Sequence, residues 1–202
     1  MNKGSLFIIS GPSGSGKDTV LKEVFKLLPD VAFSISTITR PMRVGEIEGE
    51  KYNFVTKEKF LSMLENDELL EFNEYVGNFY GTPRKPVEQA LLKGQDMLLE
   101  VDVNGAFKVK EKMKDAVSIF IMPPSFAELK RRLSSRGTDD EAVINKRMNE
   151  ALREIENAVN YDYIVVNDNI LAAAQDVEHI ILSSRLKTAR KKEIINEVLE
   201  KC

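Results

Sequence analysis

Hydrophobic and polar positions divide the chain into alternating strands and helices. Short apolar runs at 6–9, 96–102, 117–122 and 161–166 predict buried strands. Apolar residues recur at helical spacing at 20–28, 83–93 and 106–113, and further helices are expected after Ser125, at 139–160 and beyond 169. This alternation predicts an α/β fold of three layers, in which a parallel central sheet is covered by helices on both faces.

Residues 33–82 form a block that is richer in predicted strands than its neighbours. Residues 31–39 alternate between apolar and hydroxyl side chains, which predicts one strand with a polar face. A loop is expected at 40–50, and short strands at 51–55, 69–76 and 78–80. Thr56 is suited to cap a helix whose inner face carries residues 59, 60, 63 and 64. The β-rich block is therefore a predicted insertion in the parallel fold.

A glycine-rich turn lies between the first predicted strand and the first predicted helix. Its spacing, G-x-x-x-x-G-K, ends at Lys17. Glycines let several backbone N–H groups point at one anion, the helix N-terminus adds partial positive charge, and the lysine reaches the outer phosphates. An ordinary βα turn rich in Gly and Ser is the weaker interpretation, because the strand and helix supply the context that the motif requires. The predicted phosphate-binding residues are Gly11, Pro12, Ser13, Gly14, Ser15, Gly16, Lys17, Asp18 and Thr19.

Asp18 departs from the usual form of this motif. The position after the lysine is normally Ser or Thr, whose hydroxyl contacts Mg²⁺. Here the hydroxyl comes one residue later, at Thr19. Asp18 is therefore expected either to contact Mg²⁺ or its waters, or to point away from the phosphates.

Charge and composition limit the classes of partner. Twenty-nine basic and 32 acidic residues give a net charge of −3, so no overall attraction to nucleic acid or to an anionic membrane is expected. The single cysteine, Cys202, excludes an intrachain disulfide and a thiolate metal cluster. The sequence contains neither an apolar run of membrane-spanning length nor a signal-peptide pattern at its start. We therefore expect a cytoplasmic protein.

Four ordered blocks carry a resemblance to a known family. They are residues 10–17, residues 39–46 with Gly49 and Tyr52, residues 77–82, and residues 136–138 with 145–147. Together they resemble guanylate kinase, a P-loop nucleoside monophosphate kinase, over almost the whole chain. The resemblance implies transfer of the ATP γ-phosphate to GMP, and to dGMP, in purine nucleotide metabolism. It also implies a single domain with a core at 1–32, 83–125 and 156–202, a GMP-binding subdomain at 33–82 and a helical lid at 126–155.

The resemblance implies a GMP site built mainly from the inserted block. Two arginines three residues apart can hold one phosphate dianion through charge-assisted hydrogen bonds, and tyrosine hydroxyls can add donors. A carboxylate can accept both the N1–H and the N2 amine of guanine, while a hydroxyl donates to O6, so adenine would be rejected. The implied GMP-binding residues are Ser36, Arg40, Arg43, Tyr52, Glu71, Tyr80, Thr82 and Asp102.

The resemblance also implies residues for transfer and for the metal. Phosphoryl transfer needs positioning and positive charge rather than a protein nucleophile. The implied catalytic residues are Lys17, Arg43, Arg136 and Arg147, and Arg132 and Asn167 join the phosphate loop in binding ATP. Mg²⁺ accompanies ATP, and Asp18, Glu100 and Asp102 are expected to reach it through water.

Two other functions fit parts of the sequence. One is a kinase for another phosphorylated acceptor, and the other is a non-catalytic guanylate-kinase-like module that binds phosphopeptides. The retained base-reading residues argue against the first, and the retained phosphate loop argues against the second. The oligomeric state is open between monomer and homodimer. Residues 183–202 combine a basic cluster with apolar residues at helical spacing, which favours a terminal helix packed on the core over a self-association helix.

Overall fold

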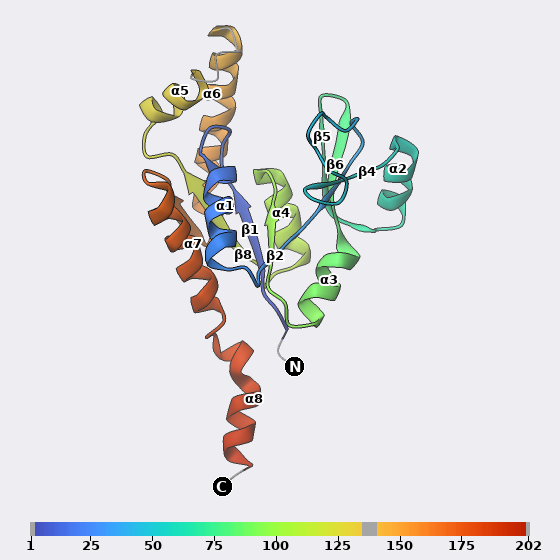
Figure 1. The fold of residues 1–202 in the computed structure, drawn as a ribbon, viewed down its shortest axis with the longest axis vertical. Helices are drawn as coiled ribbons and strands as arrows, with labels where there is room; N and C mark the ends of the chain where they lie inside the picture. The colour runs from blue at the N-terminus through green and yellow to red at the C-terminus, as the bar shows by residue number, and fades with distance from the viewer. Residues whose placement is uncertain (1–2, 135–140, 201–202) are drawn as a thin grey trace.

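The computed structural model describes residues 3–134 and 141–200. Its central feature is a five-stranded parallel sheet in the order β2-β7-β1-β8-β9 (Figure 1). The strands are β1 (Leu6–Ser10), β2 (Ala32–Phe33), β7 (Met97–Glu100), β8 (Val117–Met122) and β9 (Tyr163–Val166). The predicted parallel sheet is therefore confirmed.

Helices cover both faces of this sheet, as predicted. Within β1, Phe7 and Ile9 face α1 (Lys17–Leu27) and α7 (Ile170–Ser184), with which they share one buried apolar cluster. Leu6 and Ile8 belong to the opposite cluster, beneath α3 (Arg84–Leu92) and α4 (Val103–Lys112). A strand buried on both faces reads as a continuous apolar run, which is why β1 shows no alternation. Three layers result, with the core on either side of the sheet.

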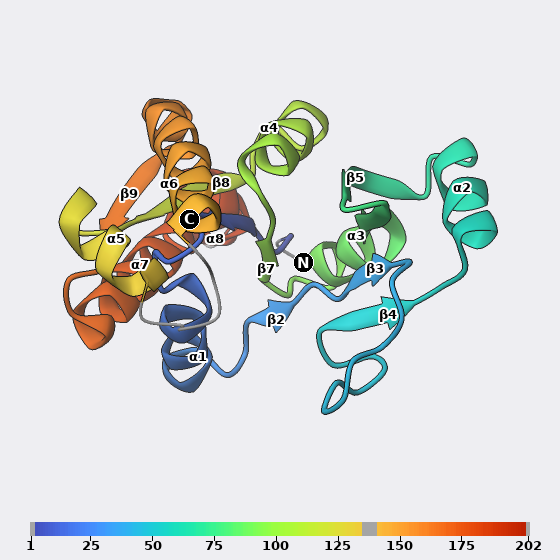
Figure 2. The ribbon, with the colours of Figure 1, turned by 90° about the horizontal axis from the view of Figure 1, so that it is seen from above.

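A second sheet stands beside the first, in the order β4-β3-β6-β5 (Figure 2). Its strands are β3 (Ser36–Ile38), β4 (Tyr52–Phe54), β5 (Leu69–Tyr75) and β6 (Asn78–Pro83), and α2 (Lys57–Glu65) packs on it. Thr56 caps α2 as predicted, because its hydroxyl accepts from the Lys59 backbone N–H. Phe60 and Met63 are buried on the inner face, whereas Lys59 is exposed.

The prediction of a single strand at 31–39 is wrong. Residues 32–33 pair with β7 in the central sheet, and residues 36–38 pair with β4 and β6 in the second sheet. The chain has to leave one sheet and enter the other within a few residues, so the extended segment is divided between the two sheets.

Two helices stand above the phosphate loop. They are α5 (Phe126–Ser134) and α6 (Glu141–Glu156), followed by the short 3₁₀ helix η1 (Asn157–Asn160). Leu129 and Leu133 of α5 pack with Met148 and Ala151 of α6 in a cluster of their own. Ser125 caps α5 as predicted, since its hydroxyl accepts from the Glu128 backbone N–H.

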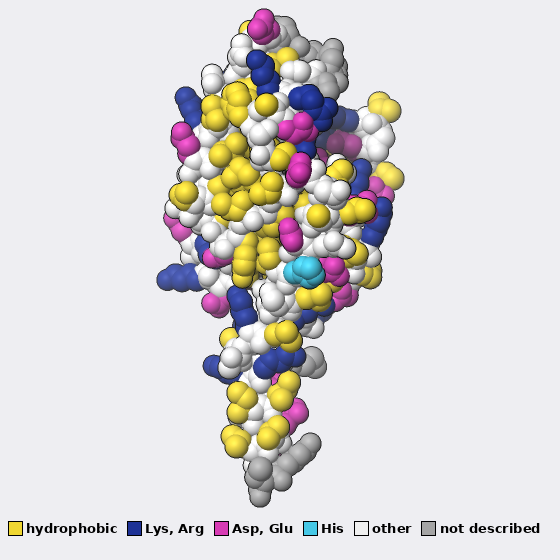
Figure 3. All heavy atoms as spheres, turned by 90° about the vertical axis from the view of Figure 1, so that its left-hand side faces the viewer, with side chains coloured by type: hydrophobic (Ala, Val, Ile, Leu, Met, Phe, Trp, Pro, Cys, Tyr) yellow, Lys and Arg dark blue, Asp and Glu magenta, His cyan; other side chains and the backbone are white. Residues whose placement is uncertain are grey.

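The last helix, α8 (Thr188–Leu199), extends away from the rest of the molecule (Figure 1) and has no buried residue. The prediction that it packs on the core is wrong, and apolar side chains lie exposed along it (Figure 3). Its base is held by Asp96, a carboxylate that is 4% exposed and pairs with Arg185 at 2.8 Å and Arg190 at 2.9 Å. No helix among the described residues is long and apolar enough to cross a membrane.

Candidate active site

The phosphate loop runs from the end of β1 to the start of α1, at the carboxyl edge of the central sheet. Gly14 and Gly16 have φ values of 89° and 84°, a left-handed conformation that side chains other than glycine rarely adopt. A Cβ at Gly14 would lie 3.0 Å from Leu129 and Leu133, and one at Gly16 would lie 2.3 Å from the Asn167 amide. Backbone curvature and close packing by α5 and residue 167 therefore both require glycine here.

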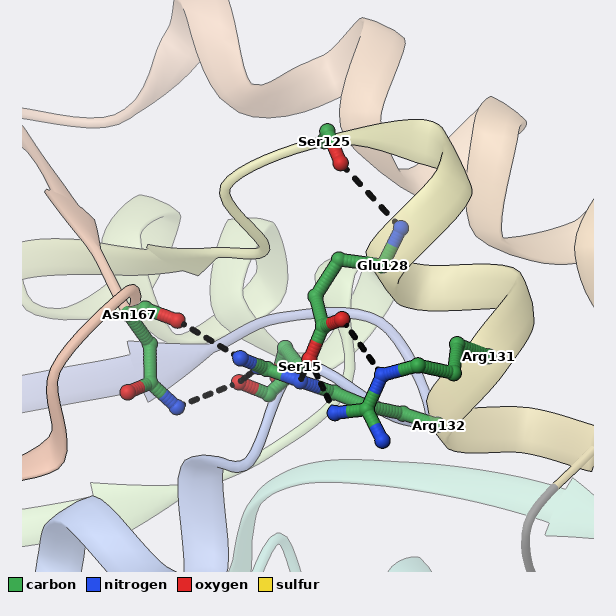
Figure 4. A network of polar contacts seen from close by, with 6 residues as sticks. All are labelled: Ser15, Ser125, Glu128, Arg131, Arg132 and Asn167. Atoms are coloured by element: carbon green, nitrogen blue, oxygen red, sulfur yellow. Dashed lines mark hydrogen bonds and ion pairs between the residues drawn. The ribbon is translucent and has the colours of Figure 1, made fainter.

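Asn167 and Arg132 both contact this loop at Ser15 (Figure 4). The Asn167 amide donates to the Ser15 carbonyl at 2.7 Å, and Arg132 donates to the Ser15 carbonyl at 3.3 Å and to the Asn167 carbonyl at 3.0 Å. Glu128 accepts from Arg132 at 2.7 Å, which orients the guanidinium. Both residues expected to bind ATP thus contact the phosphate loop at the Ser15 carbonyl, and neither is among the residues that line the cleft described below.

Lys17 is the first residue of α1, and its ammonium lies 2.7 Å from Oε1 of Glu100. Glu100 ends β7, which pairs in parallel with β1, with Ile9 opposite Glu100. The carboxyl ends of adjacent parallel strands meet at one edge of a sheet, and this brings the lysine and the carboxylate together. Their side chains are 19% and 15% exposed, so the pair is substantially shielded from water.

Asp18, the residue that departs from the motif, has a partner from the second sheet. Its Oδ1 lies 3.0 Å from the ammonium of Lys51, which also lies 3.2 Å from Oε2 of Glu100. Burial opposes ionisation of Asp18, but Lys51 and Lys17 together leave its pKa below the ordinary value. Asp18 therefore faces the cleft as a carboxylate and does not point away from it.

Glu71 lies on β5, is buried, and lines the same cleft as the glycines of the phosphate loop. Burial raises its pKa to about 7, although a hydrogen bond from the Thr82 hydroxyl, 2.7 Å from Oε1, favours the ionised form. The negative charge of Asp102 raises the pKa of Glu71 further, and the positive charge of Lys108 opposes this increase. Thr82 is 1% exposed and therefore acts on this carboxylate from behind.

Arg40 is buried and forms two hydrogen bonds with the carboxylate of Glu46. Its two terminal nitrogens lie 2.7 and 2.5 Å from the two carboxylate oxygens, and this hydrogen bonding lowers the pKa of Glu46 to about 2. The guanidinium also lies 5.4 Å from the Tyr52 ring centroid. Arg43 is exposed, and its backbone N–H donates to the same carboxylate at 2.8 Å. Glu46 thus organises the loop that carries both arginines.

Asp102 is held at the N-terminus of α4. One carboxylate oxygen accepts from the Gly105 backbone N–H at 2.7 Å, and the other accepts from the Asn73 amide. Glu154 of α6 lines the same cleft, and its pKa is raised to about 7, chiefly by burial and then by the charge of Asp102. Glu154 therefore ionises less readily than a solvent-exposed glutamate.

One cleft of about 630 Å³ joins these groups. It is lined by the phosphate loop on one side and by the second sheet on the other. Among the residues expected from the sequence, those lining it are Gly11, Pro12, Ser13, Gly14, Ser15, Gly16, Lys17, Asp18, Thr19, Ser36, Arg40, Arg43, Tyr52, Glu71, Tyr80, Glu100 and Asp102.

Of the expected lid arginines, Arg132 and Arg147 are described, and neither is part of that lining. Arg147 of α6 donates to the Ser13 hydroxyl at 2.6 Å, so it reaches the phosphate loop from above. Arg136 lies outside the described residues. The described part of the chain contains no group of three or more His, Cys, Asp or Glu side chains arranged to hold a metal ion. Asp18 and Glu100 remain as carboxylates near the lysine, each bonded to an ammonium.

Sequence reasoning missed four polar residues that line the cleft, and two of them had a usable signal. Asn73 is two residues from Glu71 on one strand, so both share a face. Glu154 is seven residues from Arg147, which is two helical turns. Lys51 and Tyr75 also line the cleft. Lys51 had no signal beyond its position beside Tyr52, because its partners come from other parts of the chain.

Comparison with known proteins agrees with this arrangement. The sequence profile of the family described as guanylate kinase matches residues 3–184, so α8 lies beyond it. Guanylate kinase of Carboxydothermus hydrogenoformans is 47% identical over 190 residues, covering 94% of this chain and 93% of that protein. Guanylate kinase of Oceanobacillus iheyensis is 47% identical over 198 residues, covering 98% and 96%.

A solved structure gives the same result. Guanylate kinase from Anaplasma phagocytophilum superimposes with a TM-score of 0.77 at 39% identity, covering 94% of this chain and 90% of that one. Neither a different phosphorylated acceptor nor a non-catalytic phosphopeptide module is favoured by these matches. The chain therefore belongs to the guanylate kinase family, whose reaction converts GMP and ATP to GDP and ADP.

Proposed function

We propose that this chain binds ATP at the phosphate loop and GMP against the second sheet, and transfers the phosphoryl group within the cleft between them. The observation that carries the proposal is the cleft itself, which Lys17 and Glu71 both line. The loop offers backbone N–H groups and a lysine, which suit a triphosphate. The opposite wall offers two arginines, three tyrosines and the buried carboxylate of Glu71, which suit a guanine monophosphate.

Guanine recognition is assigned to Glu71, with Thr82, Ser36 and Asp102 in support. The ionised Glu71 carboxylate would accept from N1–H and the N2 amine, and Thr82 holds it in place at 2.7 Å. Ser36 lines the same cleft and would donate to O6. Asp102 is kept near the base by its bonds to Gly105 and Asn73. None of these groups reads the 2′-hydroxyl, so dGMP is proposed as a second substrate.

The GMP phosphate is assigned to Arg40, Arg43, Tyr52 and Tyr80. Arg40 is fixed by its bidentate bonds to Glu46, and Tyr52 lies against its guanidinium. Arg43 is exposed at the cleft, and its positive charge can meet the dianion directly. Together, the two guanidinium groups and the two tyrosine hydroxyls would hold the attacking phosphate oxygen in line with the phosphoryl donor.

Transfer is assigned to Lys17, Arg43, Arg147 and Arg136. The migrating group carries negative charge spread over its oxygens, so cations around it lower the barrier. Arg147 already contacts the phosphate loop through Ser13. Helices α5 and α6 would cover the cleft as a lid at 126–155, which excludes the water that would otherwise accept the phosphoryl group. The proposed core consists of residues 1–32, 83–125 and 156–202, and the proposed GMP subdomain of residues 33–82.

Mg²⁺ is proposed to enter with ATP. The residues fit such an ion through water rather than as a complete protein cage, because Asp18 and Glu100 lie beside Lys17 while a cluster of three ligands is lacking among the described residues. When bound, the ion neutralises charge on the phosphates. Asp102 is the weakest of the three candidates, since both of its oxygens accept hydrogen bonds from protein groups. A Mg²⁺ dependence unchanged in Asp18→Ser would exclude a special metal role for Asp18.

A coupled assay tests the function. The protein is given ATP and, in turn, GMP, dGMP, AMP, CMP and UMP, and ADP formation is followed. Turnover with GMP and dGMP that exceeds the rest by roughly 10⁴-fold in kcat/KM is expected, because a buried carboxylate rejects a base without matching donors. Equal rates with AMP would contradict the assignment of Glu71. The proposal includes a cytoplasmic role in purine nucleotide metabolism, as a monomer or homodimer.

A further inference from the structure

Lys51 is a cleft residue to which the proposed binding and transfer roles give no task. It directly precedes β4, in the subdomain assigned to GMP. Its ammonium lies 3.0 Å from Asp18 in α1 and 3.2 Å from Glu100 at the end of β7. One side chain of the GMP subdomain thus contacts two carboxylates of the core.

Glu100 is shared between two ammonium groups. Its Oε1 lies 2.7 Å from Lys17, and its Oε2 lies 3.2 Å from Lys51. The Glu100 side chain is only 15% exposed, so these charges interact with less screening than surface pairs do. The position of Lys51 is thereby tied to the position of Lys17, although the two come from different parts of the fold.

Asp18 completes this group of four charges. At the place where the motif usually has a hydroxyl, this chain has a carboxylate, and that carboxylate pairs with Lys51. The Asp18 side chain is 64% exposed and that of Lys51 is 46% exposed, so this pair alone would contribute little to stability. Its significance lies in where it is, between the phosphate loop and the GMP subdomain.

We propose that Lys51 is a positioning residue for phosphoryl transfer, which sets the GMP subdomain against the phosphate loop through Asp18 and Glu100. The inference rests on the proposed two-sided cleft. Each substrate is held by its own side, so a link between the sides acts on the alignment of the two phosphates. Misalignment of reacting groups by about 1 Å can cost a factor of about 100 in rate. Loss of the link should therefore lower kcat while leaving the binding of each nucleotide alone unchanged.

The experiment compares Lys51→Met, Lys51→Arg, Asp18→Ser and the double variant Asp18→Ser/Lys51→Met with the wild type. Lys59→Met is the matched control, because Lys59 is an exposed lysine of the same subdomain outside the cleft. Steady-state assays give kcat and both KM values. Calorimetric titrations with GMP alone and with ADP alone give binding without turnover, and thermal unfolding verifies that each variant is folded.

We expect kcat of Lys51→Met to fall roughly 10-fold, with both KM values and both titrations within twofold of wild type. Lys51→Arg should retain most of the activity, and Lys59→Met all of it. At saturating Mg²⁺, where any effect of Asp18 on metal affinity is removed, the double variant should be no slower than Lys51→Met alone, because the pair is already lost in the single variant.

Three results would overturn the proposal. An unchanged kcat in Lys51→Met would show that Lys51 does not position the GMP subdomain for phosphoryl transfer. Weakened binding of GMP alone or ADP alone would make Lys51 an ordinary binding residue. Multiplied losses in the double variant would show that Asp18 and Lys51 act separately. Failure of the proposed function is distinguishable from all of these, since the wild-type protein itself would then lack GMP-dependent turnover.

Discussion

Lys17 and Glu100 form an ion pair of 2.7 Å at the carboxyl edge of the central sheet, between the first residue of α1 and the last residue of β7. The carboxylate holds the ammonium at the mouth of the phosphate loop before any nucleotide arrives. Preorganised charge of this kind needs little rearrangement during the reaction, which is what makes it effective in catalysis.

Replacing Lys17 by alanine should reduce kcat roughly 100-fold or more, since it removes a positive charge aimed at the transferred group. The coupled assay with ATP and GMP measures the loss. Lys17→Met, which keeps most of the side-chain volume, should lose about as much and thereby separates charge from packing. Near-normal turnover in both variants would contradict the role given to Lys17.

The affinity for GMP should rise with pH through the titration of Glu71. Burial raises the pKa of Glu71 to about 7, and only the ionised carboxylate accepts both guanine donors. Below pH 7 a proton has to be lost on binding, so affinity should fall by up to about tenfold for each pH unit. Calorimetric titration with GMP between pH 5.5 and 8.5 measures this dependence.

Glu71→Gln is the control for that pH series. It keeps the titration of the GMP phosphate, whose second pKa is about 6, and removes the titration of residue 71. Its affinity should be low at every pH, and its pH dependence should be that of the phosphate alone. Identical profiles for the variant and the wild type would place the titrating group elsewhere.

Asn167→Ala should raise the KM for ATP about fivefold and leave the KM for GMP within twofold. The Asn167 amide, which is 1% exposed, holds the Ser15 carbonyl of the phosphate loop at 2.7 Å. Loss of this bond leaves that carbonyl with the longer hydrogen bond from Arg132, at 3.3 Å, and should cost about 1–3 kcal/mol of stability. An equal rise in both KM values would show that the loop is not the part affected.

Asp96→Ala should lower the free energy of unfolding by about 2–3 kcal/mol, as followed by urea denaturation. The buried carboxylate accepts hydrogen bonds from Arg185, Arg190 and the Ser5 backbone N–H. Its removal leaves the two partly buried guanidinium groups without their carboxylate partner. Asp30→Ala is the matched control. Asp30 pairs with the same Arg185 but is 62% exposed, so its loss should cost under about 1 kcal/mol.

Much of the fold could be predicted because the relevant signals are local. An apolar run such as 6–9 indicates a strand buried on both faces, and Thr56 and Ser125 cap helices through groups three residues away. The two failures come from tertiary geometry. Residues 31–39 alternate like one strand, yet they cross between two sheets, and α8 has an amphipathic pattern but no buried residue.

The candidate site divides in the same way. The glycine spacing before Lys17 is a contiguous motif whose chemistry can be inferred from spacing alone, and the pair Arg40 and Arg43 belongs to a contiguous block that carries the family resemblance. The importance of Lys51 could not be inferred from the sequence, because its partners Asp18 and Glu100 are 33 and 49 residues away and no pattern in the sequence connects them.

By itself, the sequence determined the alternating α/β architecture, the phosphate loop and the residues suited to a guanine nucleotide. The first two follow from periodicity and from side-chain chemistry at short spacing, whereas the third follows from the resemblance to guanylate kinase; all three are properties of the chain before it folds. Only the tertiary structure decided the alignment of the two sides of the cleft and the ionisation of Glu71. It also decided the partner of Asp18, the place where the phosphate-loop motif departs from its usual form. Burial and ion pairing depend on groups that folding brings together from distant parts of the chain.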